Sequence, residues 1–327
     1  MRTPLVSVII ATYNRAGFVV QAVESVLSQT YAHIETIVVD DGSTDNTREV
    51  LRKYQDKIHY YYQERSERSR ARNEGFKRSK GAYIAFLDSD DLWLPTKIER
   101  QVQVLNEKSD VGLVYARVEF IDTDGNPCDG NLSWDEPERE VLYEDLMTHN
   151  IVTGTTSSAM IRRTCLERVG LFAESMNTCE DLDLYRRIAR YYQFHQIDLP
   201  LVKFRVHGGN TQHNASSMAR GWEITIEKIL RDTPPRFEYY KNEAIVKILS
   251  QMARLYRQDG QLWRFFCFCS KSLFHRPNWV LRYGFWRDAL RLAIEKYFVK
   301  GPNCKATRKF SSPRPPASTI RFNQRGR

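Results

Sequence analysis

Short apolar runs alternate with helical patterns through the first third of the chain. The runs cover residues 6–11, 36–40, 83–88 and 111–116, and apolar residues recur at helical spacing between them. Residues 58–63 read as a further, less apolar strand. Runs this short and this continuously apolar are typical of strands that are buried on both faces. Strands separated by helices indicate βαβ units. We therefore expect an α/β fold in which a mostly parallel sheet is flanked by helices.

The second half of the sequence is more mixed and divides the chain into three parts. Residues 157–161 and 201–206 read as strands, whereas residues 180–192 have a helical pattern with one apolar face. From residue 221 onward the patterns are helical, and the end of the chain is basic with few apolar side chains. The expected parts are an α/β domain, a helical region and a disordered tail, over residues 1–215, 216–299 and 300–327.

The net charge of +9 raises the question of nucleic-acid binding. Eight of the nine excess positive charges lie in residues 300–327, which contain no acidic residue, so residues 1–299 carry a net charge of about +1. A nearly neutral body argues against a specific nucleic-acid partner, because such binding depends on many phosphate contacts. No apolar stretch reaches the roughly 18 residues of a membrane-spanning helix, and the N-terminus lacks signal-peptide features. We therefore expect a cytoplasmic protein.

Three carboxylates lie within four residues at the end of the apolar run 83–88. The segment reads Asp88-Ser89-Asp90-Asp91. Such carboxylates repel each other unless a cation neutralises them, and oxygen ligands suit Mg²⁺ or Mn²⁺. The alternative is a solvated acidic loop that caps the next helix. Ligands of parallel sheets lie beyond the carboxyl ends of the strands, so the position of the segment favours the metal site.

A second acidic turn, Asp40-Asp41-Gly42-Ser43, ends the run 36–40. A carboxylate here can accept a hydrogen bond from the imide N–H of a uracil ring, and Gly42 permits a tight turn. Taken alone, the segment is better explained as a turn and helix cap. The chain has no G-x-G-x-x-G after its first strand and no G-x-x-x-x-G-K-[ST] motif, which argues against a dinucleotide oxidoreductase and a P-loop NTPase.

Three sequence blocks together resemble a known family. They read VSVIIATYNRAG, IVVDDGSTDNT and ARNEGFKRSKGAYIAFLDSDDLW within residues 5–116, with weaker similarity in CEDLDLYRRIA and FRVHGGN. In this order and spacing they resemble the family 2 glycosyltransferases of the GT-A fold. The resemblance implies inverting transfer of a sugar from a nucleoside-diphosphate donor, with UDP the expected nucleotide, to a hydroxyl group. The implied acceptor is a saccharide or lipid-linked saccharide, in the synthesis of a polysaccharide, O-antigen or glycolipid.

The resemblance also implies residues that bind the donor and the metal. The implied donor-binding residues are Thr12, Tyr13, Asn14, Asp40, Asp41, Arg72, Asp88 and Ser89. Among them, residues 12–14 resemble the loop that contacts the base, and Asp41 resembles the carboxylate that binds uracil. Asp88 would face the ribose. Asp90 or Asp91 would hold Mn²⁺ or Mg²⁺, and the sequence does not distinguish between the two.

Glu180-Asp181 resembles the ED pair of the family, whose Asp is the general base. Inversion requires a base on the acceptor hydroxyl, and a carboxylate is the common choice. We expect the N-terminal dipole of the helix 180–192 to hold Asp181 ionised, with Glu180 beside it in the catalytic site. His207 lies where GT-A enzymes often place a histidine near the metal. A structural histidine is an equally good interpretation.

The chain departs from the family pattern in the loop 63–70. Family members often carry N-x-G where this chain has Arg65-Ser66-Glu67. The loop is highly charged, so Arg68 or Arg70 could contact the diphosphate, or the whole loop could be a mobile solvated flap. The sequence does not decide between these interpretations.

An aromatic stripe edged by basic residues lies in the helical pattern 279–299. This helix either packs on the catalytic domain or lies in a membrane interface, where the basic tail would add attraction to anionic lipids. The second interpretation places the protein peripherally on the inner face of the membrane.

Two further functions are alternatives to sugar transfer. One is a catalytically silent nucleotide-sugar-binding subunit, against which the presence of both DSDD and ED argues. The other is a nucleotidyltransferase, which also uses paired acids and Mg²⁺ but fits the ED helix and the DDGS turn less well.

Overall fold

The computed structural model describes residues 3–129, 143–147, 155–210 and 215–258, together with several single positions. These positions are Val152, Gly260, Gln261, Trp263, Arg264, Cys267, Phe268 and Ser270. The helix expected at 279–299 and the tail expected at 300–327 lie outside the described residues. Within the described ranges, no helix combines the length and the apolar character needed to cross a membrane.

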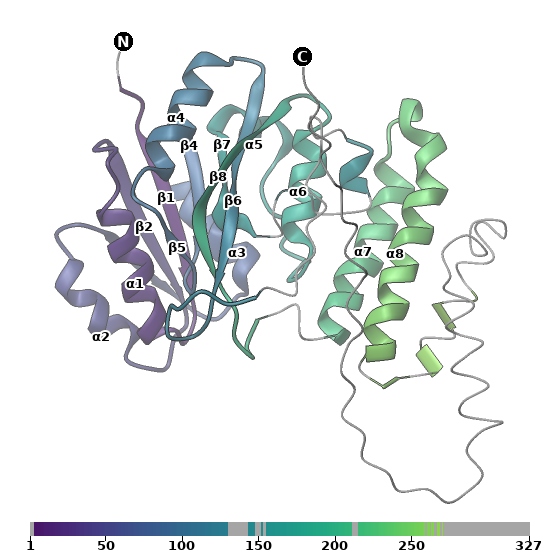
Figure 1. Cartoon of the computed structure of the whole chain (residues 1–327), viewed down its shortest axis with the longest axis horizontal. Helices are drawn as coiled ribbons and strands as arrows, with labels where there is room; N and C mark the ends of the chain where they lie inside the picture. The colour runs from purple at the N-terminus through teal and green to yellow at the C-terminus, as the bar shows by residue number, and fades with distance from the viewer. Residues whose placement is uncertain are drawn as a thin grey trace, which may run out of the picture. The chain divides into compact units, whose positions relative to one another are not determined.

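The strands form one sheet in the order β3-β2-β1-β4-β7-β6-β8-β5 (Figure 1). Their bounds are β1 Val6–Thr12, β2 Ile34–Asp41, β3 His59–Gln63, β4 Tyr83–Asp88, β5 Leu92–Trp93, β6 Val111–Ile121, β7 Ala159–Arg162 and β8 Gln193–Arg205. Strands β1 to β4 are parallel to their neighbours in this group, and the antiparallel β7 lies between β4 and β6. The expected α/β fold with a mostly parallel sheet is confirmed.

Helices cover both faces of the sheet. The helix bounds are α1 Ala16–Leu27, α2 Thr47–Leu51, α3 Arg68–Arg78, α4 Lys97–Glu107, α5 Arg163–Val169, α6 Glu180–Ile188, α7 Ala215–Asp232 and α8 Glu238–Gln258. α1 and α4 lie on one face and α3 on the other, whereas α7 and α8 pack against each other. Side chains of β2 alternate between the two faces, as a strand requires. Val38 belongs to the apolar cluster that includes residues of α1 and α4, whereas Ile37 and Val39 pack with Ala71 of α3.

Several boundaries differ from the sequence expectation. β8 begins at Gln193 rather than at residue 201, because its first half pairs with β6 through irregular register and breaks the alternation of apolar residues. For the same reason α6 ends at Ile188 rather than at residue 192: pairing with β6 begins at Gln193. The two-residue strand β5 pairs with β8 and has no periodic signal of its own.

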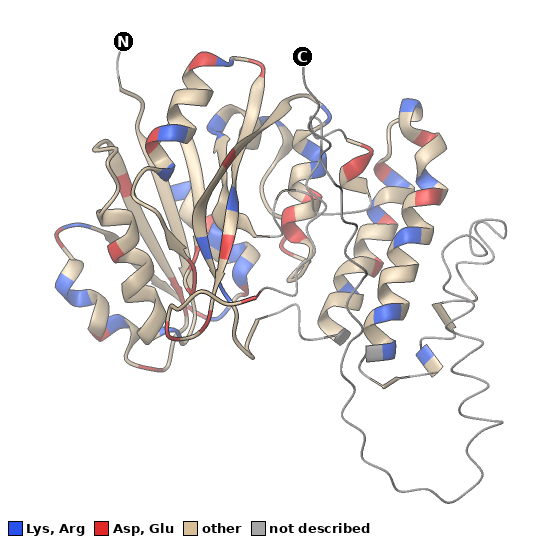
Figure 2. Ribbon diagram, in the orientation of Figure 1, with Lys and Arg blue, Asp and Glu red and all other residues tan. Residues whose placement is uncertain are grey.

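The parallel register brings the ends of three strands to one edge of the sheet. Thr12 of β1 lies beside Asp40 of β2, and Ala11 lies beside Asp88 of β4. Figure 2 shows acidic positions gathered at this edge, where β1, β2 and β4 end. The polar segments that follow these strands therefore meet, as expected for a ligand site of a parallel sheet.

Gly81 is expected to be indispensable for the start of β4. A Cβ atom at this position would lie 2.5 Å from the backbone nitrogen of Ser7 and 2.8 Å from the backbone oxygen of Leu5, neither of which can rotate away. Gly81→Ala should therefore lower the free energy of unfolding by about 1–3 kcal/mol, measured by urea denaturation. The control is Gly17→Ala in α1, where nothing lies within 4 Å and a gain of about 0.5–1 kcal/mol is expected. Equal urea midpoints for the two variants would contradict this packing.

Candidate functional site

One buried guanidinium connects the acidic segment after β4 to the start of α6. Arg72 of α3 is 3% exposed. Its Nη2 donates a hydrogen bond to Asp88 Oδ1, and its Nη1 donates to Glu180 Oε1 at 2.8 Å. Because α3 packs on β1 and β2, the side chain is fixed at the end of the sheet. The DSDD and ED segments predicted to be functional are thus brought together by a single residue.

The charge of Arg72 sets the ionisation of Asp88. Burial alone would raise the pKa of Asp88, but the positive charges of Arg72 and Arg68 and the hydrogen bonds from Arg72 and Thr156 together hold it below its usual range. Asp88 is therefore a carboxylate at neutral pH. The charge of Arg68 acts on Asp88, whereas Arg70 donates to Glu174 Oε2 at 3.0 Å.

Asp181 lies near the same charged groups, but its pKa is shifted in the opposite direction to that of Asp88. Burial and then the neighbouring charge of Glu180 raise the pKa of Asp181 to about 7. The backbone N–H of Leu182 donates to Asp181 Oδ1 at 2.8 Å and opposes this shift. The expectation that the helix dipole holds Asp181 fully ionised is therefore wrong in direction, because burial and a like charge outweigh the dipole. A carboxyl with a pKa near neutral pH suits a general base.

Asp90 and His207 form a polar pair at the surface of the site. Their Oδ2 and Nε2 atoms are 2.9 Å apart, and the two side chains are 19% and 7% exposed. Arg15 Nη2 lies 3.9 Å from Asp90, and the ring of Phe18 stacks on the imidazole of His207 at 5.6 Å between centroids. The backbone N–H of Gly209 donates to His207 Nδ1 at 3.0 Å, so that Nε2 faces Asp90.

Asp91 is buried, and its carboxylate is hydrogen-bonded within the protein. It is 1% exposed, and its carboxylate accepts hydrogen bonds from Ser157 Oγ at 2.6 Å, Thr155 Oγ1 at 3.2 Å and the backbone N–H of Arg205 at 3.1 Å. Burial, followed by the charges of Asp90 and Asp88, raises its pKa well above the usual range. The two adjacent carboxylates therefore differ: Asp91 supports the turn, and Asp90 faces outward.

The Asp90 carboxylate and the His207 imidazole are suitable ligands for a divalent cation whose other ligands come from a substrate. Among the described residues, no three His, Cys, Asp or Glu side chains cluster closely enough to enclose a metal ion. One carboxylate and one imidazole leave most positions of a six-coordinate ion to other ligands. Mg²⁺ is commonly bound by one or two carboxylates together with substrate phosphates and water, which is the arrangement that these residues allow.

The carboxylates of the DDGS turn are both engaged by the protein. Asp40 accepts hydrogen bonds from Tyr60 Oη at 2.6 Å and the backbone N–H of Ser43 at 2.9 Å. Asp41 is 2% exposed and accepts from the loop before α3. Its donors are Gln63 Nε2 at 2.7 Å, Arg65 Nη1 at 2.7 Å, Ser66 N at 2.9 Å, Ser66 Oγ at 2.8 Å and Glu67 N at 2.9 Å. The charged loop thus folds over Asp41.

The loop after β1 lies under the same arginine. The guanidinium of Arg65 lies 3.8 Å from the ring centroid of Tyr13, which is 38% exposed. Asn14 Oδ1 accepts from the backbone N–H of Thr44 at 2.8 Å and so joins this loop to the DDGS turn. The hydroxyl of Thr12 is buried without a hydrogen-bond partner, and Ser89 is buried. Arg65 therefore connects the exposed aromatic face of Tyr13 to the Asp41 carboxylate.

Non-glycine residues with positive φ flank the site. Among the described residues they are Asn14 at 48°, Glu67 at 76° and Cys179 at 60°. Glu67 stands where the family pattern has Gly, and its ψ of 156° places it in a region that is essentially restricted to glycine. Cys179 directly precedes Glu180. Backbone strain in this fold is thus concentrated beside the candidate site, as is common at functional sites.

Some residues of the site were missed by sequence reasoning. Thr155 and Ser157 bind Asp91, and Arg205 is fully buried with its Nε donating to the backbone oxygen of Asp90 at 2.9 Å. The available signals were the polar run TTSS before β7 and the Arg within the FRVHGGN block.

Comparison with known proteins shows similarity to glycosyltransferases in both the sequence profile and the individual relatives. The sequence profile described as Glycosyl transferase family 2 matches residues 7–170, about half of the chain. The chain is 33% identical over 271 residues to an uncharacterized glycosyltransferase of Rickettsia typhi, covering 80% of this chain and 82% of that protein. It is 39% identical over 153 residues to TuaG of Bacillus subtilis, named for teichuronic acid biosynthesis, covering 46% of this chain and 59% of TuaG.

The fold is also similar to that of a solved structure. The crystal structure of S. aureus TarS in complex with UDP-GlcNAc matches with a TM-score of 0.64 and 18% sequence identity, covering 84% of this chain and 82% of that chain. The similarity extends through most of the described residues, and the expected GT-A fold is confirmed.

Replacing Arg72 should destabilise the protein strongly. Arg72→Met leaves two carboxylates, Asp88 and Glu180, without their cation, so the free energy of unfolding at neutral pH should fall by about 3–5 kcal/mol. The folded-state pKa of Asp88 is lowered, so this contribution is present above the unfolded pKa and is lost as the pH falls through the folded one. The difference between wild type and variant in urea denaturation should therefore shrink in acid.

The matched control is Arg70→Met on the same helix. Arg70 pairs with Glu174, but its side chain is 57% exposed, so its loss should cost no more than about 1 kcal/mol. Equal costs for the two arginines would contradict the assigned role of Arg72.

Glu67→Gly should stabilise the protein. Glycine accepts the φ of 76° without strain, and the exposed Arg65–Glu67 ion pair that is lost contributes little. A gain of about 1 kcal/mol in the free energy of unfolding is expected. The control is Glu64→Gly in the same loop, where φ is not positive and glycine should cost about 0.5–1 kcal/mol. A loss in both variants would show that Glu67 is unstrained.

Proposed function

The chain belongs to glycosyl transferase family 2, and we propose that it transfers a sugar from a UDP-sugar to a hydroxyl group of a saccharide or lipid-linked saccharide, with inversion at the sugar. The observation that carries the proposal is the bridge of Arg72 between Asp88 and Glu180. It brings the donor-side carboxylates to the carboxyl with a pKa of about 7. Inverting transfer needs these two groups close together, on opposite sides of the reacting carbon.

The base of the donor would bind between the first two strand ends. The exposed ring of Tyr13 provides a stacking surface, the Thr12 hydroxyl lacks a partner, and Asp41 can accept a hydrogen bond from an imide N–H. Arg65 covers both the ring and the carboxylate. Donor binding would therefore exchange the guanidinium for the base and release Arg65 into solvent. Asp88, held by Arg72, would accept hydrogen bonds from the ribose.

A divalent cation, Mn²⁺ or Mg²⁺, would be held by Asp90 and His207 together with the donor diphosphate. When bound, such an ion supplies positive charge that stabilises the departing diphosphate. The outward position of Asp90 and its 2.9 Å contact with His207 Nε2 support this assignment over Asp91. Arg15, 3.9 Å from Asp90, adds positive charge on the same side. The contact between Asp90 and His207 would open to admit the ion.

Asp181 would accept the proton of the acceptor hydroxyl as that oxygen attacks the sugar. Burial and then the charge of Glu180 raise its pKa, which makes it a stronger base than an exposed carboxylate. The glycosidic bond forms as the bond to the diphosphate breaks, and the proton remains on Asp181 until it exchanges with solvent. The ion pair between Arg72 and Glu180 would hold the start of α6, and with it Asp181, in position.

The acceptor would belong to the synthesis of a polysaccharide, an O-antigen or a glycolipid. The similarity to TuaG, named for teichuronic acid biosynthesis, supports this class. Membership of the family favours sugar transfer over nucleotidyl transfer, and an assay for released UDP rather than pyrophosphate separates the two. Binding to the membrane surface through residues 279–327 stays a prediction.

Asp181→Asn should abolish transfer while leaving donor binding intact. The amide keeps the shape of the side chain but cannot accept the proton. We expect release of UDP from UDP-sugars with Mn²⁺ to fall by about 10²–10⁴-fold. The same UDP-sugar should still raise the melting temperature of the variant. Near-normal turnover would refute the role of Asp181, and loss of the thermal shift in wild type would refute the donor class.

The rate of transfer should depend on the ionisation of Asp181. A general base must be deprotonated, and the pKa of about 7 means that half of the molecules carry the proton near neutral pH. kcat should therefore rise about tenfold per pH unit below pH 7 and level off above it. A kcat that is independent of pH between 5 and 8 would exclude Asp181 as the base of the rate-limiting step.

A further inference from the structure

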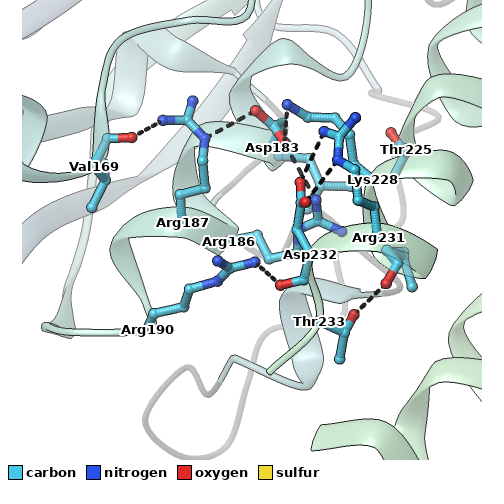
Figure 3. Close-up of polar contacts among 12 residues, drawn as sticks. Val169, Asp183, Arg186, Arg187, Arg190, Thr225, Lys228, Arg231, Asp232 and Thr233 are labelled. Carbon is cyan, nitrogen blue, oxygen red and sulfur yellow. Dashed lines mark hydrogen bonds and ion pairs between the residues drawn. The ribbon is translucent and has the colours of Figure 1, made fainter. Parts of the chain in front are cut away.

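A basic cluster lies between α6 and α7, apart from the residues assigned to donor and base (Figure 3). Its positive members are Arg186, Arg187, Arg190, Lys228 and Arg231, and its carboxylates are Asp183 and Asp232. The five cations exceed the two carboxylates by three charges. We call these seven residues the α6–α7 basic cluster.

Part of the cluster has a structural role. Asp183 is 1% exposed, and it accepts from Arg187 Nε at 3.1 Å and Lys228 Nζ at 3.2 Å. The remaining nitrogens of Arg187 donate to the backbone oxygens of residues 169–171. These contacts hold α7 and the segment after α5 against α6. They also satisfy the charge and the hydrogen bonds of Asp183 without any contribution from Arg186.

Arg186 is buried with most of its hydrogen-bonding capacity unused. It is 1% exposed, and only its Nη2 has a partner, Asp183 Oδ1 at 3.3 Å. Its Nε and Nη1 have no hydrogen-bond partner, and Arg190 Nε has none either. Arg190 Nη2 donates to the backbone oxygen of Asp232 at 2.5 Å and to Tyr143 Oη at 3.4 Å. Within the described part of the chain, no ion pair joins Arg190 to a carboxylate.

Binding of an anion would compensate the charge and the unpaired N–H groups of these two arginines. Burial is the main cause that lowers the pKa of Arg186, which means that its charged form is poorly compensated where it lies. Buried charges are normally paired and hydrogen-bonded, because an unpaired one loses its hydration without replacement. Water could satisfy the free N–H groups but would leave the buried charge of Arg186 poorly compensated. An oxyanion does both, through charge-assisted hydrogen bonds.

We propose that the α6–α7 basic cluster binds a phosphate group, held by Arg186 Nε and Nη1 and by Arg190 Nε. A phosphate dianion matches the excess charge of the cluster better than a carboxylate does, and it offers more acceptor atoms to donors that come from two side chains. The side chains of Lys228 and Arg231 are 17% and 70% exposed, so the cluster extends from the buried Arg186 to the protein surface.

The site is separate from the proposed donor site, although one helix joins them. Arg186 follows Asp181 by five residues, which places it roughly 7.5 Å further along the axis of α6. No residue of the cluster belongs to the set assigned to the base, the metal or the proton transfer. The phosphate is either free inorganic phosphate or a phosphate ester carried by a substrate. The proposal does not depend on the transfer reaction.

The test compares thermal unfolding of the full chain in sodium phosphate and in sodium chloride of equal ionic strength. Wild type should be stabilised by phosphate beyond the effect of chloride. Arg186→Met should weaken apparent phosphate affinity at least about tenfold, because it removes two charge-assisted hydrogen bonds. In phosphate-free buffer its melting temperature should be no lower than that of wild type, since an uncompensated buried charge has been removed. Arg254→Gln on the exposed face of α8 is the matched control and should keep the full phosphate response.

Two further arms make the outcome decisive. Arg186→Lys keeps the charge but loses the directed N–H groups, and it should also lose most of the phosphate response. UDP with Mn²⁺ should stabilise wild type and Arg186→Met equally, which separates this site from the donor site. Stabilisation against thermal unfolding by glycerol 3-phosphate is then compared with that by inorganic phosphate. Stronger stabilisation by glycerol 3-phosphate would assign the site to a substrate ester, and equal stabilisation would assign it to the free ion. No phosphate-specific stabilisation, an undiminished response in Arg186→Met, or a lower melting temperature of that variant without phosphate would overturn the proposal.

Discussion

The contact on which the site depends is the pair of ion pairs made by the buried guanidinium of Arg72. Asp88 ends a strand of the sheet, and Glu180 begins α6 far along the chain. The positive charge of Arg72 offsets the repulsion between these two carboxylates. The bridge therefore holds the end of β4 beside the start of α6. It also fixes the charge around Asp181, whose pKa results from burial and from these same neighbours.

Burial decides which acidic residues are free to act. Asp91 and Asp90 are adjacent, yet one is surrounded by hydroxyl and backbone donors and the other faces His207. Asp41 is likewise surrounded, but its donors come from a loop in which Glu67 holds a strained backbone angle. A strained loop can be displaced more easily than a relaxed one. Asp91 thus supports the turn, whereas the donors of Asp41 belong to the strained loop.

Much of the fold was predictable from the sequence because its signals are local. The apolar runs of β1, β2 and β4 and the turns after them required only periodicity and strand-end placement. The distinction between Asp90 and Asp91 was not predictable, because it depends on Ser157 and Arg205, which lie 66 and 114 residues from Asp91. The pKa of Asp181 was predicted in the wrong direction for the same reason: a helix dipole can be read from sequence, but burial cannot. The antiparallel β7 between β4 and β6 likewise results from tertiary pairing.

The most direct test of the site is the position of its cation in crystals grown with UDP and Mn²⁺. Anomalous scattering locates manganese independently of the rest of the electron density. The account predicts a manganese peak in direct contact with the Asp90 carboxylate, His207 Nε2 and the diphosphate, while Asp91 keeps its hydrogen bonds to Ser157 and Arg205. A peak bound by Asp91, with Asp90 still paired to His207, would contradict it.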